Sequence, residues 1–191
     1  MLPSGFLLQE DMDLSNLPQN VVAQLTKAVE DYILKNREKY FPRASALTAE
    51  QRSLLAPFFS AEDLQRARTL VLEGSRIMDP SFYSMARIMG IQNLPSFSDV
   101  AAVTFVDVIV SHERFTPSLL FHEMVHVVQY SQLGPAKFSS LYVNGFIQGG
   151  SYESIPLERN AYQLESRFSD DPSKVFSVAD EVRRWNDAGR L

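Results

Sequence analysis

Residues 116–130 read TPSLLFHEMVHVVQY, and the rest of the chain can be interpreted outward from them. Thr116 can cap a helix and the proline after it suits the first helical position, so the sequence predicts a helix that runs to Gln132. Gly134-Pro135 closes it, because glycine favours helix ends and proline cannot continue a helix. Apolar residues surround most of this helix, as is typical of a helix in the centre of a fold.

Three polar residues interrupt the apolar helix and form the pattern His122-Glu123-x-x-His126. Side chains four positions apart lie on one helical face, so both imidazoles can reach one ion. Glu123 lies about 100° round the helix from His122, where its carboxylate can touch a metal-bound water without displacing an imidazole. Burying these groups unpaired would be costly, and a divalent cation satisfies them jointly. The pattern therefore predicts a metal site with Glu123 as the catalytic base.

A catalytic zinc site needs a third protein ligand and an open position for water. An extended pattern with a third histidine would need Gly and His where Gln129 and Gln132 stand. His112 is expected on the surface or at the rim of a cleft. A carboxylate is the better candidate, because Glu158 is expected in the first turn of a new helix. Ala161, one turn further on, lets that helix pack closely on the histidine helix, so Glu158 is predicted to be the third ligand.

His122-Glu123-x-x-His126 followed by Glu158-x-x-Ala161 resembles the gluzincin branch of the zincin metallopeptidases, to which thermolysin-like enzymes belong. The likeness covers residues 100–167, and the wording FHEMVHVVQY is similar to small bacterial zincin-like proteins. It implies a zincin-like fold with a small sheet packed on an active-site helix, one Zn²⁺ ion, and hydrolysis of a peptide or protein substrate. It also implies an edge strand that pairs with an extended substrate, and the strand expected at Val100–Val110 stands at that place in the sequence.

The chain departs from the thermolysin-like pattern around the ligands. Those enzymes usually have an aspartate four residues after the glutamate ligand, where this chain has Tyr162. The residues that orient the two histidines are therefore open, with Asp107, Asn160 and Glu165 as candidates. Glu153 is expected at the surface. The donor that stabilises the oxyanion of the transition state is open as well, and its candidates are Tyr152, Tyr162, Arg159 and His112.

A zinc ion at this site would polarise a scissile carbonyl and activate a water, and Glu123 would pass the water proton to the leaving amine. Two other interpretations stay open. In a non-catalytic domain, the same metal site would fix two helices or present a surface to a protein partner. In a metal-free scaffold, the histidines and glutamates would pair with each other. A closed structural zinc site normally has four protein ligands, which favours the catalytic interpretation.

The remaining sequence predicts a mostly helical α+β protein with one domain over residues 1–191. A helical N-terminal part covers residues 1–99, the edge strand and the metal-site helices cover 100–167, and a C-terminal helix lies in 168–191. Capping and periodicity predict helices at 17–40, after Thr48 and Ser60, at 79–90, 136–148 and 156–167, and after Ser177. Strands are expected at 68–73 and 100–110.

Composition narrows the classes of partner. The 191 residues include 18 Lys and Arg against 23 Asp and Glu, a net charge of −5. Nucleic acids and anionic membranes bind clustered positive charge, so neither is expected as a partner. The absence of cysteine excludes disulfides, thiolate nucleophiles and cysteine-based metal sites. Met1–Asp13 lacks a signal-peptide pattern and no apolar run is long enough to span a bilayer, so the expected location is the cytoplasm.

Overall fold

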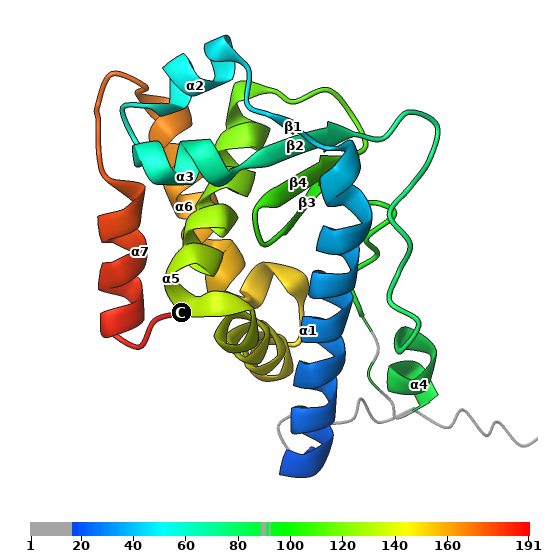
Figure 1. Cartoon of the computed structure of the whole chain (residues 1–191). Helices are drawn as coiled ribbons and strands as arrows, with labels where there is room; N and C mark the ends of the chain where they lie inside the picture. The colour runs from blue at the N-terminus through cyan, green and yellow to red at the C-terminus, as the bar shows by residue number, and fades with distance from the viewer. Residues whose placement is uncertain (1–16, 89–90, 92) are drawn as a thin grey trace, which may run out of the picture.

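The computed structural model describes residues 17–88, 91 and 93–191, in which helices predominate over a small mixed sheet (Figure 1). This confirms the predicted α+β class. The helices are α1 (Gln19–Tyr40), α2 (Ala49–Leu55), α3 (Ala61–Arg66), α4 (Tyr83–Ile88), α5 (Pro117–Gly149), α6 (Pro156–Asp170) and α7 (Val178–Asp187), with short 3₁₀ turns η2 (Phe41–Arg43) and η3 (Tyr152–Ser154). The strands are β1 (Ser45–Ala46), β2 (Arg68–Val71), β3 (Ala102–Phe105) and β4 (Val108–Ser111).

The four strands form one sheet in the order β1-β2-β4-β3. β2 runs parallel to β4, whereas the pairs β1–β2 and β3–β4 are antiparallel. Ile109 of β4 joins the apolar cluster of α5, while Val108 and Val110 join a cluster with Tyr40 of α1. This alternation follows from the two-residue period of a strand. The strand β4 is therefore buried on both faces, and β3 lies at one edge of the sheet.

The single strand predicted for Val100–Val110 is wrong, because this stretch folds as the hairpin β3–β4 with Val106 and Asp107 as its turn. Val106 has a φ of 63°, which is rare for a β-branched residue. Asp107 accepts two hydrogen bonds from the guanidinium of Arg37 in α1, at 2.7 and 2.9 Å. The side chain of Val106 packs on an apolar cluster. Contacts from distant parts of the chain thus hold a turn that lacks the usual glycine or asparagine.

Helix α5 is the element around which most of the other helices pack. Thr116 Oγ1 accepts a hydrogen bond from the N–H of Leu119 at 3.1 Å, which confirms the predicted cap. Gly134, with a φ of 73°, divides α5 into two arms, 117–133 and 135–149. The two successive helices predicted on either side of Gly134-Pro135 are thus confirmed. The first arm lies behind the sheet beside α6, and the second arm turns toward α1 (Figure 1).

Three further helices begin at the predicted hydroxyl caps. Thr48 accepts a hydrogen bond from the N–H of Gln51, and the Gln51 side chain accepts one from the N–H of Thr48, which completes a capping box at α2. Ser60 and Ser177 cap α3 and α7 by accepting from the N–H three residues on. These local patterns fix where the helices that pack around α5 begin.

The helix predicted at 79–90 is shorter in the structure, where α4 begins only at Tyr83. Asp79 does not cap it, because its carboxylate accepts a hydrogen bond from the N–H of Phe97 at 2.7 Å. The predicted helix end at Gly90 and the stretch Met1–Asp13 lie outside the described residues.

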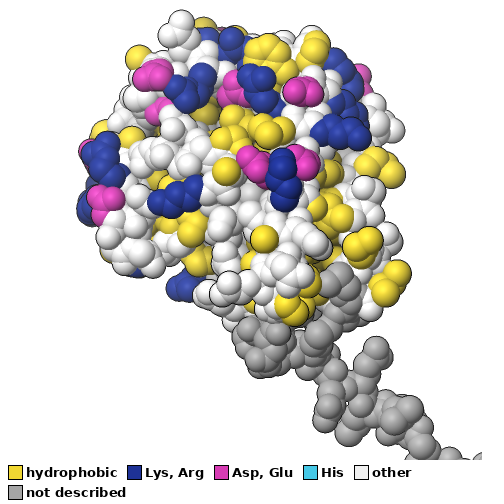
Figure 2. All heavy atoms as spheres, turned by 60° about the horizontal axis from the view of Figure 1, so that its bottom comes forward, with side chains coloured by type: hydrophobic (Ala, Val, Ile, Leu, Met, Phe, Trp, Pro, Cys, Tyr) yellow, Lys and Arg dark blue, Asp and Glu magenta, His cyan; other side chains and the backbone are white. Residues whose placement is uncertain are grey.

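Within the described residues, no helix has both the length and the apolar character needed to cross a bilayer. Figure 2 shows basic and acidic side chains close together over one face, with hydrophobic side chains scattered between them. In and just before α4, the side chains of Met78, Met85 and Ile88 are strongly exposed. This face therefore presents mixed charge rather than a continuous basic surface.

A candidate metal centre

The crossing of α5 and α6 brings the three predicted metal ligands together. His122 and His126 lie one turn apart on the first arm of α5, and Glu158 lies in the first turn of α6. The two Nε2 atoms of the histidines are 3.2 Å apart. Glu158 Oε2 lies 3.3 Å from His126 Nε2 and 3.5 Å from His122 Nε2. All three side chains are buried, so two imidazole nitrogens and one carboxylate oxygen surround a single point.

These distances fit a small coordination tetrahedron. Ligand atoms bound to a tetrahedral zinc ion at about 2.0–2.1 Å lie roughly 3.3–3.4 Å from one another. Glu158 Oε2 is buried and makes no well-formed hydrogen bond with any described residue. A buried carboxylate in that condition is costly unless a cation neutralises it. The cluster could therefore hold a metal ion, and its nitrogen and oxygen donors suit zinc.

Hydrogen bonds behind the cluster orient both imidazoles. His122 Nδ1 donates to Glu165 Oε2 at 3.1 Å, and His126 Nδ1 donates to Gln129 Oε1 at 2.8 Å. Gln129 Nε2 donates in turn to a backbone carbonyl of α6 and to Asn160 Oδ1, both at 3.0 Å, which fixes the direction of the amide. Because each Nδ1 is engaged in this way, Nε2 is the nitrogen of each ring that faces the shared site, and it can bind a metal ion once it has given up its proton.

The three candidates for orienting the histidines have different places in the structure. Glu165 contacts His122 directly, Asn160 acts through Gln129, and Asp107 lies at the β3–β4 turn instead. Gln129 was not predicted for this role. The signal that could have found it is a fully buried amide in an otherwise apolar helix arm, which is the same signal that singled out the histidines.

The charges in the cluster are strongly coupled. Burial lowers the pKa of His122, but the carboxylates of Glu158 and Glu165 outweigh burial and raise that pKa to about 10. The pKa of His126 is raised as well, because Glu158 outweighs the effect of burial. Burial acts to raise the pKa of Glu158, yet the two histidines hold it well below its usual range. The cluster therefore attracts a positive charge, either protons or a metal ion.

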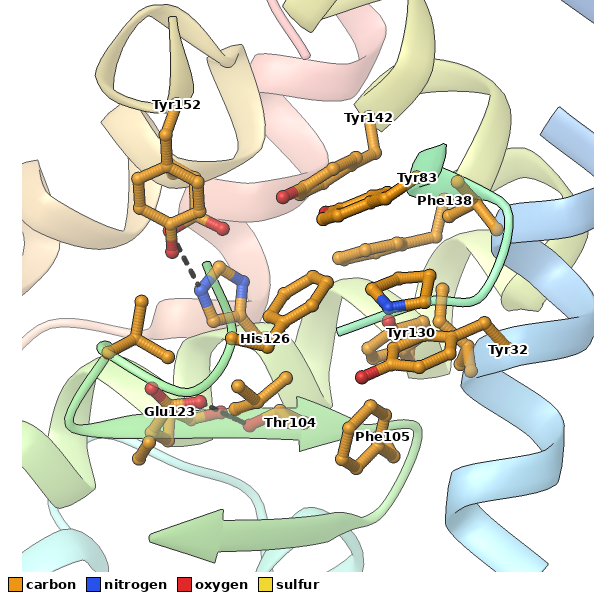
Figure 3. Close-up of a pocket in the computed structure, with 18 of the residues that line it drawn as sticks. Tyr32, Tyr83, Thr104, Phe105, Glu123, His126, Tyr130, Phe138, Tyr142 and Tyr152 are labelled. Carbon is orange, nitrogen blue, oxygen red and sulfur yellow. Dashed lines mark hydrogen bonds and ion pairs between the residues drawn. The ribbon is translucent and has the colours of Figure 1, made fainter. Parts of the chain in front are cut away.

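Glu123 lies beside the three ligands rather than among them. Thr104 of β3 donates a hydrogen bond to Glu123 Oε2 at 2.6 Å, and both side chains are buried. Glu123 and Thr104 form one wall of a hollow that His126 also lines (Figure 3). Thr104 was not predicted as a partner, because in the sequence it only interrupts an apolar stretch. Its hydrogen bond holds the carboxylate next to the candidate metal site.

His112 lies away from the cluster, after β4. Its Nε2 accepts a hydrogen bond from the N–H of Ile77 at 2.9 Å, and its Nδ1 donates to the carbonyl of Val100 at 2.7 Å. Both ring nitrogens are thus occupied by backbone groups, and His112 ties two loops together. Glu153 and Arg159 have exposed side chains, as expected for Glu153.

Two tyrosines flank the ligands. The ring centroid of Tyr162 lies 4.5 Å from that of His122, and Tyr162 is half exposed. Tyr152 of η3 points into the hollow toward His126 (Figure 3). Burial, and then the charge of Glu158, raise the pKa of Tyr152 well above 10, so its hydroxyl stays protonated at neutral pH. Of the four candidate oxyanion donors, Tyr152 is the best placed.

Comparison of the chain with known protein families, with curated proteins and with solved structures finds no match. The function of the cluster must therefore be inferred from its own geometry and chemistry.

Proposed function

We propose that the protein is a zinc-dependent peptidase of the zincin type, with His122, His126 and Glu158 as metal ligands and Glu123 as the catalytic base. One observation carries this proposal. Two oriented imidazole nitrogens and a buried carboxylate oxygen that makes no hydrogen bond with the described residues converge on one point, and the carboxylate of Glu123 lies beside that point without being part of it. A site that only held two helices together would have no use for Glu123.

When bound, zinc would supply a Lewis acid that polarises a carbonyl and acidifies a water. Glu123 would accept the proton of the attacking water and donate it to the leaving amine as the carbon–nitrogen bond breaks. Thr104 holds the carboxylate of Glu123 in place for both transfers. Tyr152 would donate a hydrogen bond to the oxyanion that develops on the substrate.

The edge strand β3 supports a peptide as the substrate. β3 pairs only with β4 among the described strands, and residues 102–105 line the hollow beside Glu123. An extended peptide can add to such an edge through main-chain hydrogen bonds. The scissile bond would then lie over the candidate metal site.

The test uses the full chain loaded with zinc, a mixture of peptides of many sequences, and mass spectrometry to identify cleavage products. The expected result is cleavage by the wild type that Glu123→Gln reduces by roughly 10²–10⁴-fold, because the general base is lost, while bound zinc is unchanged. Glu153→Gln is the matched control: it neutralises an exposed carboxylate on η3 and is expected to cleave like the wild type. Full activity of Glu123→Gln would contradict the proposed mechanism.

The rival function is a non-catalytic metal-binding domain. A structural zinc site normally has four protein ligands, whereas three His, Asp or Glu side chains of the described residues converge here. If the wild type bound zinc tightly but cleaved no peptide in the mixture, the rival would replace the peptidase.

A further inference from the structure

A hollow of about 60 Å³ opens beside Glu123, His126 and Glu158, and this is room for several water molecules. The rest of its wall comes from α1, the segment before α4, α4 itself, the segment before β3, β3, both arms of α5 and η3. This wall is aromatic and aliphatic. In Figure 3, Tyr83, Phe138 and Tyr142 lie on one side of the hollow, and Glu123 with Thr104 lies on another. A substrate group next to the reacting bond would meet this wall.

The wall carries no fixed positive charge. Among the described residues that line the hollow, the ionisable groups other than phenols are Glu123, His126 and Glu158. Burial raises the pKa of the five phenols of the wall, so they stay neutral at ordinary pH; they belong to Tyr32, Tyr83, Tyr130, Tyr142 and Tyr152. A carboxylate in the hollow would have no cationic partner apart from the metal site itself, and its desolvation would be costly.

A second, almost wholly apolar hollow of about 50 Å³ lies behind the first. Four residues border both hollows: Val29, Phe82, Tyr83 and Tyr142. The hydroxyl of Tyr142 is buried and has no hydrogen-bond partner among the described residues. Hydrogen bonding therefore does not hold Tyr142 in its place, and its ring, with those of its neighbours, separates the two spaces. These rings therefore set how far the first hollow extends.

We propose that the substrate residue next to the scissile bond carries a bulky, uncharged apolar side chain that fills the first hollow, and that Tyr142 limits its length. The proposal rests on the proposed peptidase function. The aromatic wall supplies contact area for such a group, the missing cation excludes a carboxylate, and the ring of Tyr142 closes the way into the second hollow. Tyr142 is thus a specificity-determining residue rather than a catalytic one.

The test measures binding, not turnover. Hydroxamates, which chelate zinc, are titrated into the zinc-loaded full chain by calorimetry, and their side group is methyl, benzyl, carboxyethyl or biphenylmethyl. Benzyl is expected to bind at least about tenfold tighter than methyl, because each methylene in an apolar pocket changes discrimination by about 10- to 200-fold. Carboxyethyl is expected to bind more weakly than methyl. Biphenylmethyl is expected to bind no tighter than benzyl in the wild type.

Variants at Tyr142 distinguish the effect of its ring on ligand binding from the effect of its hydroxyl group. Tyr142→Ala and Tyr142→Leu are expected to bind the biphenylmethyl hydroxamate about tenfold tighter than the wild type does. Tyr142→Phe is expected to keep the order of affinities that the wild type shows for the four hydroxamates. Leu25→Ala enlarges only the second hollow and is the matched control, so it also keeps the wild-type order.

The outcomes distinguish the two proposals. If zinc binds but the four hydroxamates bind equally well in the wild type, the proposed pocket is wrong and the peptidase proposal stands. The wild-type comparison holds even if a Tyr142 variant fails to fold. If the chain binds no zinc, the proposed function fails and this inference fails with it.

Discussion

The three histidines of this chain occupy two regions that treat the same side chain in opposite ways. At His112, the N–H of Ile77 donates to one ring nitrogen and the carbonyl of Val100 accepts from the other, so nothing is left over. At the α5–α6 crossing, the Nδ1 atoms of His122 and His126 are paired but their Nε2 atoms face each other and a carboxylate. Buried imidazoles therefore indicate a ligand site only when their remaining hydrogen-bonding capacity converges on one point.

The largest expected effect comes from exchanging the two kinds of histidine for alanine. His126→Ala is expected to weaken zinc binding by more than about 100-fold, since binding energies of about 10–16 kcal/mol over four ligands imply roughly 3 kcal/mol each. His112→Ala is expected to leave zinc affinity unchanged and to lower the free energy of unfolding by about 1–3 kcal/mol, because two backbone groups lose their partner. Competition with a chelator and denaturant unfolding measure both. Equal losses of zinc affinity in the two variants would contradict the assignment of His126 as a metal ligand and His112 as a structural residue.

Gln129 gives the next effect, because it decides which nitrogen of His126 carries the proton. Gln129→Met keeps the size of the side chain but removes the acceptor of His126 Nδ1, and is expected to weaken zinc binding by about 10- to 100-fold. Gln132→Met is the matched control on the same helix, where the exposed amide donates to the carbonyl of Ala179. Zinc affinity of Gln129→Met at the wild-type level would show that this hydrogen bond does not tune the site.

Proton release sharpens the comparison further. In protein stripped of metal, the raised pKa of His122, about 10, keeps its imidazole protonated at neutral pH. The stability that His122 gains from Glu158 and Glu165 is then fully present below pH 6.5 and is lost as pH rises toward 10. Zinc must displace that proton, so its affinity is expected to rise about tenfold per pH unit between those limits. Calorimetry in buffers of different ionisation enthalpy measures the protons released, and zero protons at pH 7 would contradict the charge state assigned to the cluster.

The elements that could be predicted from the sequence are those whose patterns lie within a short stretch of the chain. The cap at Thr116, the break at Gly134 and the spacing of His122 and His126 each need only a few neighbouring residues. The hairpin was not predicted because Val106 is β-branched and not a turn residue by type, and no glycine follows Asp107 to complete a common turn pattern. Their conformation depends on Arg37, which lies far away in the chain. Strand β1 is too short to leave a pattern.

Within the site, too, the features that could be predicted have local signals, and the others depend on tertiary contacts. Helical periodicity predicts that two histidines share a face, and spacing along the chain suggested Glu158. The partners Gln129 and Thr104 depend on how α6 and β3 lie against α5, and no local pattern reports that arrangement. Asp107, a candidate by residue type alone, lies in the hairpin turn and pairs with Arg37 instead.

The zinc content of the wild-type protein tests the central claim most directly. The full chain is purified without an affinity-metal step, and its metals are quantified by elemental mass spectrometry before and after incubation with zinc and removal of the excess. One zinc ion per chain is expected, and it should disappear in Glu158→Ala while persisting in His112→Ala. A wild type that holds no metal and takes up none would contradict the account, and His122, His126 and Glu158 would then be a buried, proton-bridged cluster.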